Sequence, residues 1–307
     1  MSRDALCVIC GSGSRPLFEK YGYWIRECEG CGHQFAEIEQ SDGHVRQIYG
    51  DHYFNGDPAG YPDYLAEGDL LIAHGRKYAR MLRRYMKPGT VLDVGTAAGF
   101  ILKGFEEGGW TCRGIEPNVR MAEYARSDLG LAIEAVSLEQ VESSDTYDLV
   151  TMIQVVMHFI NPREALRLAA EITRPGGYWL IETWNRESWT ARMFRESWQT
   201  YSPPSVLHWF SIMGLRILVE GLGFDEVGHG RPQKWVRASH ATALLRYKFE
   251  ESVVGRLVGG LIGVVPQRVA VPYLGDDIFW GLYRKRAMGK QRASRDEDLG
   301  RREAARV

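Results

Sequence analysis

The chain has 307 residues, of which 45% are hydrophobic, and its formal net charge is −1. This length is enough for more than one ordinary domain, and this hydrophobic share is enough for a sizeable core. A near-neutral charge excludes a general electrostatic attraction to nucleic acid or to a membrane surface, so either would need a local patch.

The apolar segments do not indicate secretion or a membrane span. The first seven residues lack the apolar stretch of a signal peptide. The longest apolar run, Val253 to Val265, is broken by Arg256 and by glycines, and it is shorter than the ~20 residues that a spanning helix needs. Four of the five cysteines form two close pairs, which is not an extracellular disulfide pattern. We therefore expect a cytoplasmic protein without a membrane span.

Two CxxC pairs near the N-terminus predict a metal site. Cys7 and Cys10 are separated by 17 residues from Cys28 and Cys31, close to the spacing of a four-thiolate zinc site. Four thiolates leave no open coordination position, so the zinc would be structural. We predict a small zinc ribbon over residues 1–40 with these four cysteines as ligands. A redox dithiol or chance spacing is the alternative.

The predicted ribbon is acidic, with six acidic and four basic residues over 1–40. Phosphate binding needs the opposite sign, so nucleic acid is not the expected partner. His33 is expected to be a surface or packing residue, because four cysteines already complete a tetrahedron. A scaffold or substrate-gating role for the ribbon follows.

The middle of the chain alternates short apolar strands with helical segments, the pattern of a doubly wound parallel sheet. Its first unit, Val91 to Phe100, runs into a helix over 101–108 and forms a ligand-binding elbow at the carboxyl edge of the sheet. The dinucleotide fingerprint is broken at Ala97 and Phe100, and Asp93 would face a pyrophosphate. A ligand with a cationic end and no phosphate fits better, such as S-adenosylmethionine.

The second strand, Trp110 to Ile115, ends in an acidic residue. Glu116 at this position can accept hydrogen bonds from both hydroxyls of a ribose. A helix then follows to Leu129, with Gly130 as its stop.

At this point the chain resembles the class I S-adenosylmethionine-dependent methyltransferases. The motifs that carry the resemblance are LDVGTAAG at 92–99, GIEP at 114–117, YDLVTMIQVVMHFINP at 147–162, RPGGYWLIETWN at 174–185 and WQTYSPPSVLHWFS at 198–211. The chain is similar in particular to the methyltransferases of natural-product and surface-sugar pathways that carry a cysteine ribbon. The resemblance implies a Rossmann-like α/β fold with a mostly parallel seven-stranded sheet, preceded by a small zinc ribbon.

The resemblance also implies cofactor contacts. Glu116 would take the ribose, and the segment Val136–Leu138 would take the adenine, although Ser137 alone is equally well a plain strand-end residue. The methionine part would be held by Asp93, Gly95, Ala97 and Gly99. The full set of cofactor-binding residues that we predict is Asp93, Gly95, Ala97, Gly99, Glu116, Ser137, Leu138, Gln154, Arg76 and Tyr64.

An aromatic arm over residues 41–88 precedes the cofactor unit. In the resembled group such a segment folds over the cofactor, whereas packing between ribbon and domain is the alternative. Arg76 could meet the cofactor carboxylate as a planar fork, or it could lie on a solvated helix face. The aromatic residues of the arm are Tyr49, Tyr53, Phe54, Tyr61 and Tyr64.

Methyl transfer to a hydroxyl or carbon acceptor needs a base, and histidine is the first suspect near pH 7. His158 follows a strand over 149–155, and His208 follows a strand over 178–183 and its loop. In the resembled group a glutamate precedes the first histidine, but here Met157 stands in its place. We predict His208 and His158 as catalytic residues, with His208 as the base; capping or core roles are the alternatives.

The remaining boundaries follow from the same patterns. We expect the methyltransferase domain over 89–286, with a helical insertion over 234–276 and a closing strand, Ile278 to Lys285. A polar, basic tail over 287–307 is expected to be disordered.

The sequence therefore predicts transfer of a methyl group from S-adenosylmethionine to a small-molecule acceptor, of natural-product or sugar type, at O, C or N. Ribosomal RNA methylation is the enzymatic alternative, but the ribbon is acidic. The residues Gln154 to Met157 also lack the Asn/Asp-Pro-Pro-aromatic clamp for exocyclic amines. A catalytically inactive cofactor-binding partner is the other alternative, motivated by Met157. The sequence leaves the acceptor and the oligomeric state open.

Overall fold

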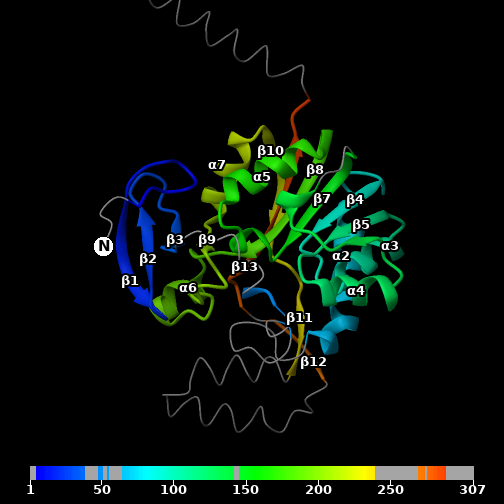
Figure 1. Ribbon diagram of the computed structural model, residues 1–307, viewed down its shortest axis with the longest axis horizontal. Coiled ribbons are helices and arrows are strands. Elements are labelled where there is room, and N and C mark those ends of the chain that lie inside the picture. Colours follow the sequence, from blue (N-terminus) through cyan, green and yellow to red (C-terminus); the bar gives the residue numbers. More distant parts are fainter. Residues whose placement is uncertain are drawn as a thin grey trace, which may run out of the picture.

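The structure is a computed structural model, and Figure 1 shows its architecture. It describes residues 5–38, 48–50, 54, 64–141, 145–238, 269–273 and 275–287. Tyr53 and Tyr61 of the arm lie outside the described residues, as do most of the expected insertion and tail. The described ends of the insertion pair as strands, β11 (Trp235–Arg237) with β12 (Ala270–Pro272), and the helical segment expected over 241–265 lies outside the described residues.

The larger sheet has seven strands in the order β10-β13-β8-β7-β4-β5-β6. The five strands from β8 to β6 are parallel, whereas β13 runs antiparallel to both of its neighbours. This arrangement confirms the predicted Rossmann-like, mostly parallel sheet. The strands are β4 (Thr90–Val94), β5 (Thr111–Ile115), β6 (Ile133–Glu134), β7 (Tyr147–Ile153), β8 (Thr173–Trp184), β10 (Phe224–Gly230) and β13 (Ile278–Lys285).

The strand order reverses at β4, which lies between β5 on one side and β7 on the other. In open α/β sheets the carboxyl ends of the strands on either side of such a reversal form the ligand crevice. The site is therefore expected where β4, β5 and β7 end.

Helices cover both faces of the sheet, because successive strand residues point to opposite sides. Val150 of β7 packs with α5 and α7, whereas its neighbour Leu149 packs with α2, α3 and α4. The helices are α2 (Gly68–Leu82), α3 (Phe100–Glu107), α4 (Val119–Ser127), α5 (Pro162–Glu171), α6 (Trp189–Phe194) and α7 (Ile212–Gly221). The 3-10 turns are η2 (Leu65–Glu67), η3 (Leu138–Gln140), η4 (Val156–His158) and η5 (Arg195–Ser197). None of the helices in the described part of the chain is long and apolar enough to cross a membrane.

Side-chain caps explain where several helices begin. The Asn118 side chain accepts a hydrogen bond from the backbone N–H of Met121 and caps α4, and Asn161 caps α5 ahead of Pro162. Ser211 caps α7 by accepting from Gly214 at 2.9 Å. Each such cap satisfies a backbone donor that the first helical turn leaves unpaired.

The N-terminal ribbon shares a sheet with the larger α/β domain. Its strands β1 (Ser14–Lys20), β2 (Tyr23–Cys28) and β3 (Gln34–Ala36) pair antiparallel, and β3 then pairs with β9 (His208–Trp209). In Figure 1 this small blue sheet lies beside β9 at the edge of the larger domain. The sequence did not indicate β9, because two residues carry no periodicity and their partner is distant in the chain.

Candidate cofactor and acceptor site

The turn after β4 has an unusual backbone that glycine makes possible. Gly95, Ala97 and Gly99 all have positive φ, at +66°, +48° and +81°. A Cβ on Gly95 would lie 2.7 Å from Cγ2 of Val155, so no larger residue fits there without a shift. The non-glycine Ala97 is held in this conformation while its N–H donates to Glu116 Oε2 at 2.8 Å. The turn therefore requires glycine at position 95, both for its positive φ and for the close approach of Val155.

Two buried carboxyl groups flank this turn. Asp93 accepts hydrogen bonds from the hydroxyls of Thr151 at 2.5 Å and Thr96 at 2.7 Å. Burial nevertheless raises the pKa of Asp93 to about 6. Burial, reinforced by the charge of Asp93, raises the pKa of Glu116 to about 7 against the backbone donors Asn118 and Ala97. A cationic ligand would favour the ionised form of both groups.

The described part of the aromatic arm covers the same turn. The Tyr64 ring lies 5.8 Å from that of Phe100, the first residue of α3, and 5.5 Å from that of Phe54. These rings form a buried cluster with Ala97 of the glycine turn. Tyr64 is thus held beside the predicted methionine-binding segment.

Tyr49 connects the end of β5 with the loop that precedes β9. Its carbonyl accepts from Asn118 Nδ2 at 3.0 Å, and its hydroxyl donates to the carbonyl of Ser205 at 2.6 Å. Tyr49 therefore links the Glu116 side of the crevice to the side that carries His158.

Ser137 and Leu138 lie just after β6, where the β5–β6 side of the crevice ends. The backbone N–H of Ser137 donates to Gln140 Oε1 at 3.1 Å, and Leu138 is buried. Arg76 differs from the expectation of a cofactor contact. Its guanidinium pairs with Glu107 of α3 on an exposed surface, which corresponds to the alternative of a solvated helix face.

His158 lies in η4, beyond the carboxyl end of β7. Its Nδ1 is 2.6 Å from the carbonyl oxygen of Ser205, and its ring lies 5.2 Å from that of Tyr49. Because a carbonyl only accepts hydrogen bonds, Nδ1 carries the proton and Nε2 of the neutral ring carries the lone pair. This tautomer can take a proton at Nε2.

His208 lies elsewhere than expected. It belongs to β9, where its ring is buried between ribbon and domain, 5.2 Å from the stacked ring of His33. Its Nδ1 lies 3.0 Å from Nε2 of His33, so His33 is a packing residue as predicted. Burial lowers the pKa of His208 to about 4. A buried imidazole with this pKa is poorly suited to accept a proton near pH 7.

The four ribbon cysteines converge. Their Sγ atoms all lie within 4.8 Å of one another, with Cys10–Cys28 at 3.3 Å and Cys7–Cys31 at 3.7 Å. A tetrahedron with Zn–S bonds of about 2.3 Å has sulfurs about 3.8 Å apart. The donor set and its spacing therefore fit a four-thiolate zinc ion.

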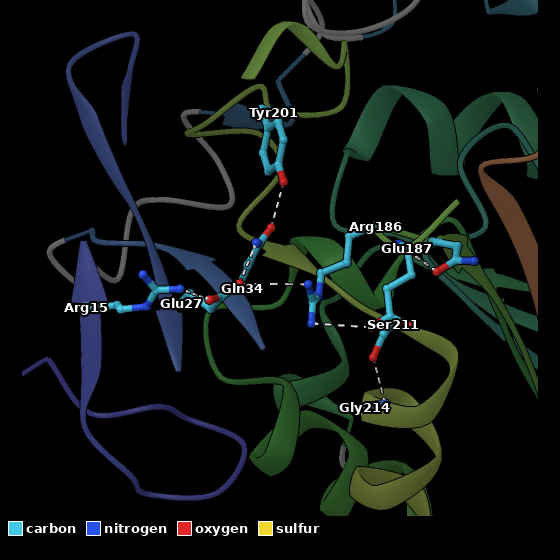
Figure 2. A network of polar contacts seen from close by, with 9 residues as sticks. Arg15, Glu27, Gln34, Arg186, Glu187, Tyr201, Ser211 and Gly214 are labelled. Atoms are coloured by element: carbon cyan, nitrogen blue, oxygen red, sulfur yellow. Dashed lines mark hydrogen bonds and ion pairs between the residues drawn. The ribbon is translucent and has the colours of Figure 1, made fainter. Parts of the chain in front are cut away.

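A polar network joins the ribbon to the domain (Figure 2). Glu27 of β2 accepts from Arg15 at 2.6 Å and from Gln34 Nε2 at 3.0 Å, and Arg186 of the domain lies 3.9 Å away. The Tyr201 hydroxyl donates to Gln34 Oε1 at 2.6 Å. These contacts, with the β3–β9 pairing, fix the ribbon on the loop that follows β8.

Sequence reasoning missed one group of polar residues. Glu182 of β8 is buried and accepts from His74 and Gln154, both at 2.9 Å, and from the hydroxyl of Tyr78. An acidic residue inside the apolar run YWLIETW was the signal that could have found it, because a buried charge requires partners.

Comparison with known proteins agrees with this geometry. The profile of a protein family described as methyltransferase domain matches residues 67–228. This is more than half of the 307 residues, and the chain belongs to that family. The matched segment of the chain is therefore a methyltransferase domain.

Particular relatives match only parts of the sequence. The ubiquinone biosynthesis O-methyltransferase of Alkalilimnicola ehrlichii is 26% identical over 178 residues, which are 56% of this chain and 63% of that protein. The protein of the same name from Bordetella avium is 30% identical over 103 residues, which are 31% of this chain and 43% of that protein. The chain thus spans less than two thirds of the length of these curated relatives.

Solved structures share the fold at low sequence identity. The 1,6-didemethyltoxoflavin-N1-methyltransferase of Burkholderia thailandensis, with bound S-adenosylhomocysteine, aligns with a TM-score of 0.52 at 14% identity, covering 89% of this chain and 99% of that one. A chain from the complex of the Haloferax volcanii Trm112 methyltransferase activator with a methyltransferase aligns with a TM-score of 0.52 at 16% identity, covering 72% and 91%.

Proposed function

We propose that the protein transfers the methyl group of S-adenosylmethionine to a small-molecule acceptor, of natural-product or sugar type, at O, C or N. The observation that carries this is the pair of buried carboxyls, Asp93 and Glu116, around a left-handed glycine turn. Such a site suits a cationic ligand and disfavours a pyrophosphate. The relatives named above for small-molecule acceptors support the choice of acceptor class.

Within this function each part of the cofactor has candidate residues. Glu116 retains lone pairs beyond its backbone contacts and is the candidate for the ribose. Ser137 and Leu138 are the candidates for the adenine, and Tyr64 completes the surroundings. The methionine part would contact Asp93, Gly95, Ala97 and Gly99. When bound, S-adenosylmethionine supplies the methyl group and its leaving group.

The protein's own contribution to the reaction is alignment and, for some acceptors, proton removal. His158 is the candidate for a proton acceptor at Nε2, because Ser205 fixes its tautomer. His208 is a positioning residue between ribbon and domain in this proposal. An amine or an acceptor that is already ionised would need no base.

We also propose that Cys7, Cys10, Cys28 and Cys31 hold one structural zinc ion, which the spacing of their sulfurs supports. The ion would stabilise the ribbon and take no part in the methyl transfer.

A labelled-methyl transfer assay tests the function. The purified protein is incubated with labelled S-adenosylmethionine and, separately, with sugar nucleotides, polyketide-type phenols, small amines and ribosomal RNA. The control is Asp93→Ala, which should abolish transfer to any true acceptor. Label in a small molecule supports the proposal, and label in RNA alone would establish the nucleic-acid alternative. Tight binding of S-adenosylhomocysteine with no transfer would indicate an inactive partner module.

A further inference from the structure

Glu182 is the centre of a buried polar cluster that the proposed reaction does not use. Its carboxylate accepts hydrogen bonds from His74 Nε2 and Gln154 Nε2, each at 2.9 Å, and from the Tyr78 hydroxyl. Burial alone would raise the pKa of Glu182, but His74, Lys234 and Tyr78 outweigh it and hold that pKa at about 2. The three hydrogen-bond donors that converge on this carboxylate stabilise its ionised form.

An ionised carboxylate determines how the neighbouring amide is turned. A carboxylate has no proton to donate, so Gln154 must face Glu182 with its NH₂ group. Its carbonyl oxygen Oε1 then points away from the cluster. Within the part of the chain that the structure describes, no group donates a hydrogen bond to this oxygen.

The backbone places this amide at the edge of the cofactor crevice. Gln154 directly follows β7, and its N–H donates to the Glu182 carbonyl at 2.8 Å. Its φ of +59° is strained for a residue with a side chain. The next residue, Val155, fills the space over Gly95 of the glycine turn. The Gln154 amide is thus fixed between β8 and the turn that receives the cofactor.

We infer that Gln154 Oε1 accepts a hydrogen bond from the methyl acceptor, and that Glu182 is the positioning residue that keeps this oxygen turned toward it. The inference rests on the proposed function and deepens it. The acceptor must carry an O–H or N–H group at or beside the atom that is methylated. An analogue that lacks this donor should lose affinity without any change in cofactor binding.

The first test compares Gln154→Met with Gln34→Met, using the phenol, sugar nucleotide or amine that the transfer assay identifies. Gln34 is buried, and it bridges Glu27 and Tyr201 at the ribbon (Figure 2). Gln154→Met should raise the acceptor KM roughly 3- to 10-fold, the effect of one lost hydrogen bond, with unchanged affinity for S-adenosylhomocysteine. Gln34→Met should leave the acceptor KM unchanged. If Gln154→Met leaves KM unchanged, or weakens S-adenosylhomocysteine instead, the inference is wrong.

The second test does not need an acceptor. In ¹⁵N-labelled protein the Gln154 side-chain amide should give one pair of strongly shifted NH₂ resonances that stays constant between pH 5 and pH 8. Glu182→Gln should collapse this shift and also raise the acceptor KM, because a neutral amide no longer dictates the orientation. A parent spectrum with an averaged, unshifted amide would overturn the inference. Absence of transfer by the parent protein would contradict the proposed function, a separate outcome.

Discussion

Asp93 and Glu116 share an unusual property at the level of single residues. Both are carboxyl groups whose pKa is raised, to about 6 and about 7, in a crevice without an opposing cation among the described residues. The two groups lie at the ends of β4 and β5, on either side of the glycine turn. Loss of their protons is therefore linked to the arrival of a cationic ligand.

This linkage predicts a pH-dependent cofactor affinity. Between pH 5 and pH 8, S-adenosylmethionine should bind more tightly as the pH rises, because Asp93 and Glu116 must lose their protons to contact the cation and the ribose hydroxyls. Glu116→Gln should bind about 1–3 kcal/mol more weakly and with a shallower pH dependence. Titration calorimetry at several pH values measures both effects. His229→Ala, at an exposed histidine, is the control, and a pH-independent affinity in the parent would contradict the assignment.

The two histidines should separate in a kinetic experiment. His158→Ala should lower single-turnover rates with a hydroxyl acceptor by roughly 10²–10⁴-fold and leave S-adenosylhomocysteine affinity unchanged. His208→Ala should instead lower the unfolding temperature, because it removes a buried ring stacked on His33. Rates across pH and thermal melts provide the readouts. If His158→Ala keeps near-parental turnover while His208→Ala is well folded but inactive, then His208 is the base and His158 has the structural role.

At the level of elements, the segment at β9 connects the ribbon to the side of the crevice that carries His158 through backbone hydrogen bonds. The N–H of Leu207 donates to Met157 O at 2.9 Å, and the Leu207 carbonyl accepts from Ala36 of β3 at 2.9 Å. Leu207 therefore links the backbone of the ribbon strand β3 to Met157, the residue that directly precedes His158.

Removal of the zinc that we propose should therefore loosen specific elements. Chelation, or Cys28→Ser, should speed amide hydrogen exchange in β1–β3, β9 and η4 by roughly tenfold or more, equivalent to about 1.4 kcal/mol of local stability. Exchange in α2 and α3 should change little, because their buried residues belong to the core on the opposite face of the sheet from the ribbon. Mass spectrometry after exchange locates the effect. Equal loosening throughout the described residues would argue against a local role, and less than one zinc per chain in freshly purified protein would contradict the metal site itself.

The glycine turn allows a matched pair of substitutions. Gly95→Ala meets both a positive φ of +66° and the Val155 side chain, whereas Gly130→Ala meets a φ of +69° with nothing within 4 Å. Each should lose about 1 kcal/mol of stability for its backbone strain. Gly95→Ala should lose more and should also weaken S-adenosylhomocysteine binding. Chemical denaturation and calorimetry measure the two quantities, and equal effects of the two variants would show that the close approach of Val155 is unimportant.

For the whole molecule, the same carboxyl groups predict how stability depends on pH. The pKa of Glu182 is lowered to about 2, so its contribution is present above its unfolded value near 4.5 and is lost as the pH falls toward 2. The raised pKa of Glu116 has the opposite sign: its contribution is present below pH 4.5 and is lost as the pH rises to about 7. The raised pKa of Asp93 has the same sign as that of Glu116, so its contribution to stability is lost as the pH rises to about 6.

Unfolding of the cofactor-free protein by urea should therefore become easier from about pH 4.5 to pH 7. Glu116→Gln should reduce this loss of unfolding free energy between pH 4.5 and pH 7. Glu182→Gln should reduce the loss of unfolding free energy below pH 4.5. Saturation with S-adenosylhomocysteine should raise stability most near pH 7, because the ligand compensates for the buried charges. If the unfolding free energy of a variant keeps the parent's dependence on pH in the range assigned to the substituted residue, another group is responsible for that dependence.

The sequence by itself determined the fold class, and it predicted the cofactor elbow and the four cysteines that the structure brings together. These features are local: the CxxC turns, the strand–glycine–helix unit with Asp93, and Glu116 at the next strand end each lie within a few residues. Hydrophobic alternation then placed the closing strand at Ile278–Lys285 with the bounds that the structure gives. Short-range sterics and hydrogen bonding decide such features, and a single stretch of sequence contains them.

The tertiary structure alone decided what depends on residues far apart in the chain. The pairing of β9 with β3 joins residues more than 170 positions apart and turns His208 from an expected base into a buried partner of His33. The Glu182 cluster likewise brings donors from α2 and from the end of β7 to an acceptor on β8. Periodicity shows which residues are buried, but not which buried polar groups meet, because that depends on how distant strands and helices pack and on the hydrogen bonds that their burial then requires.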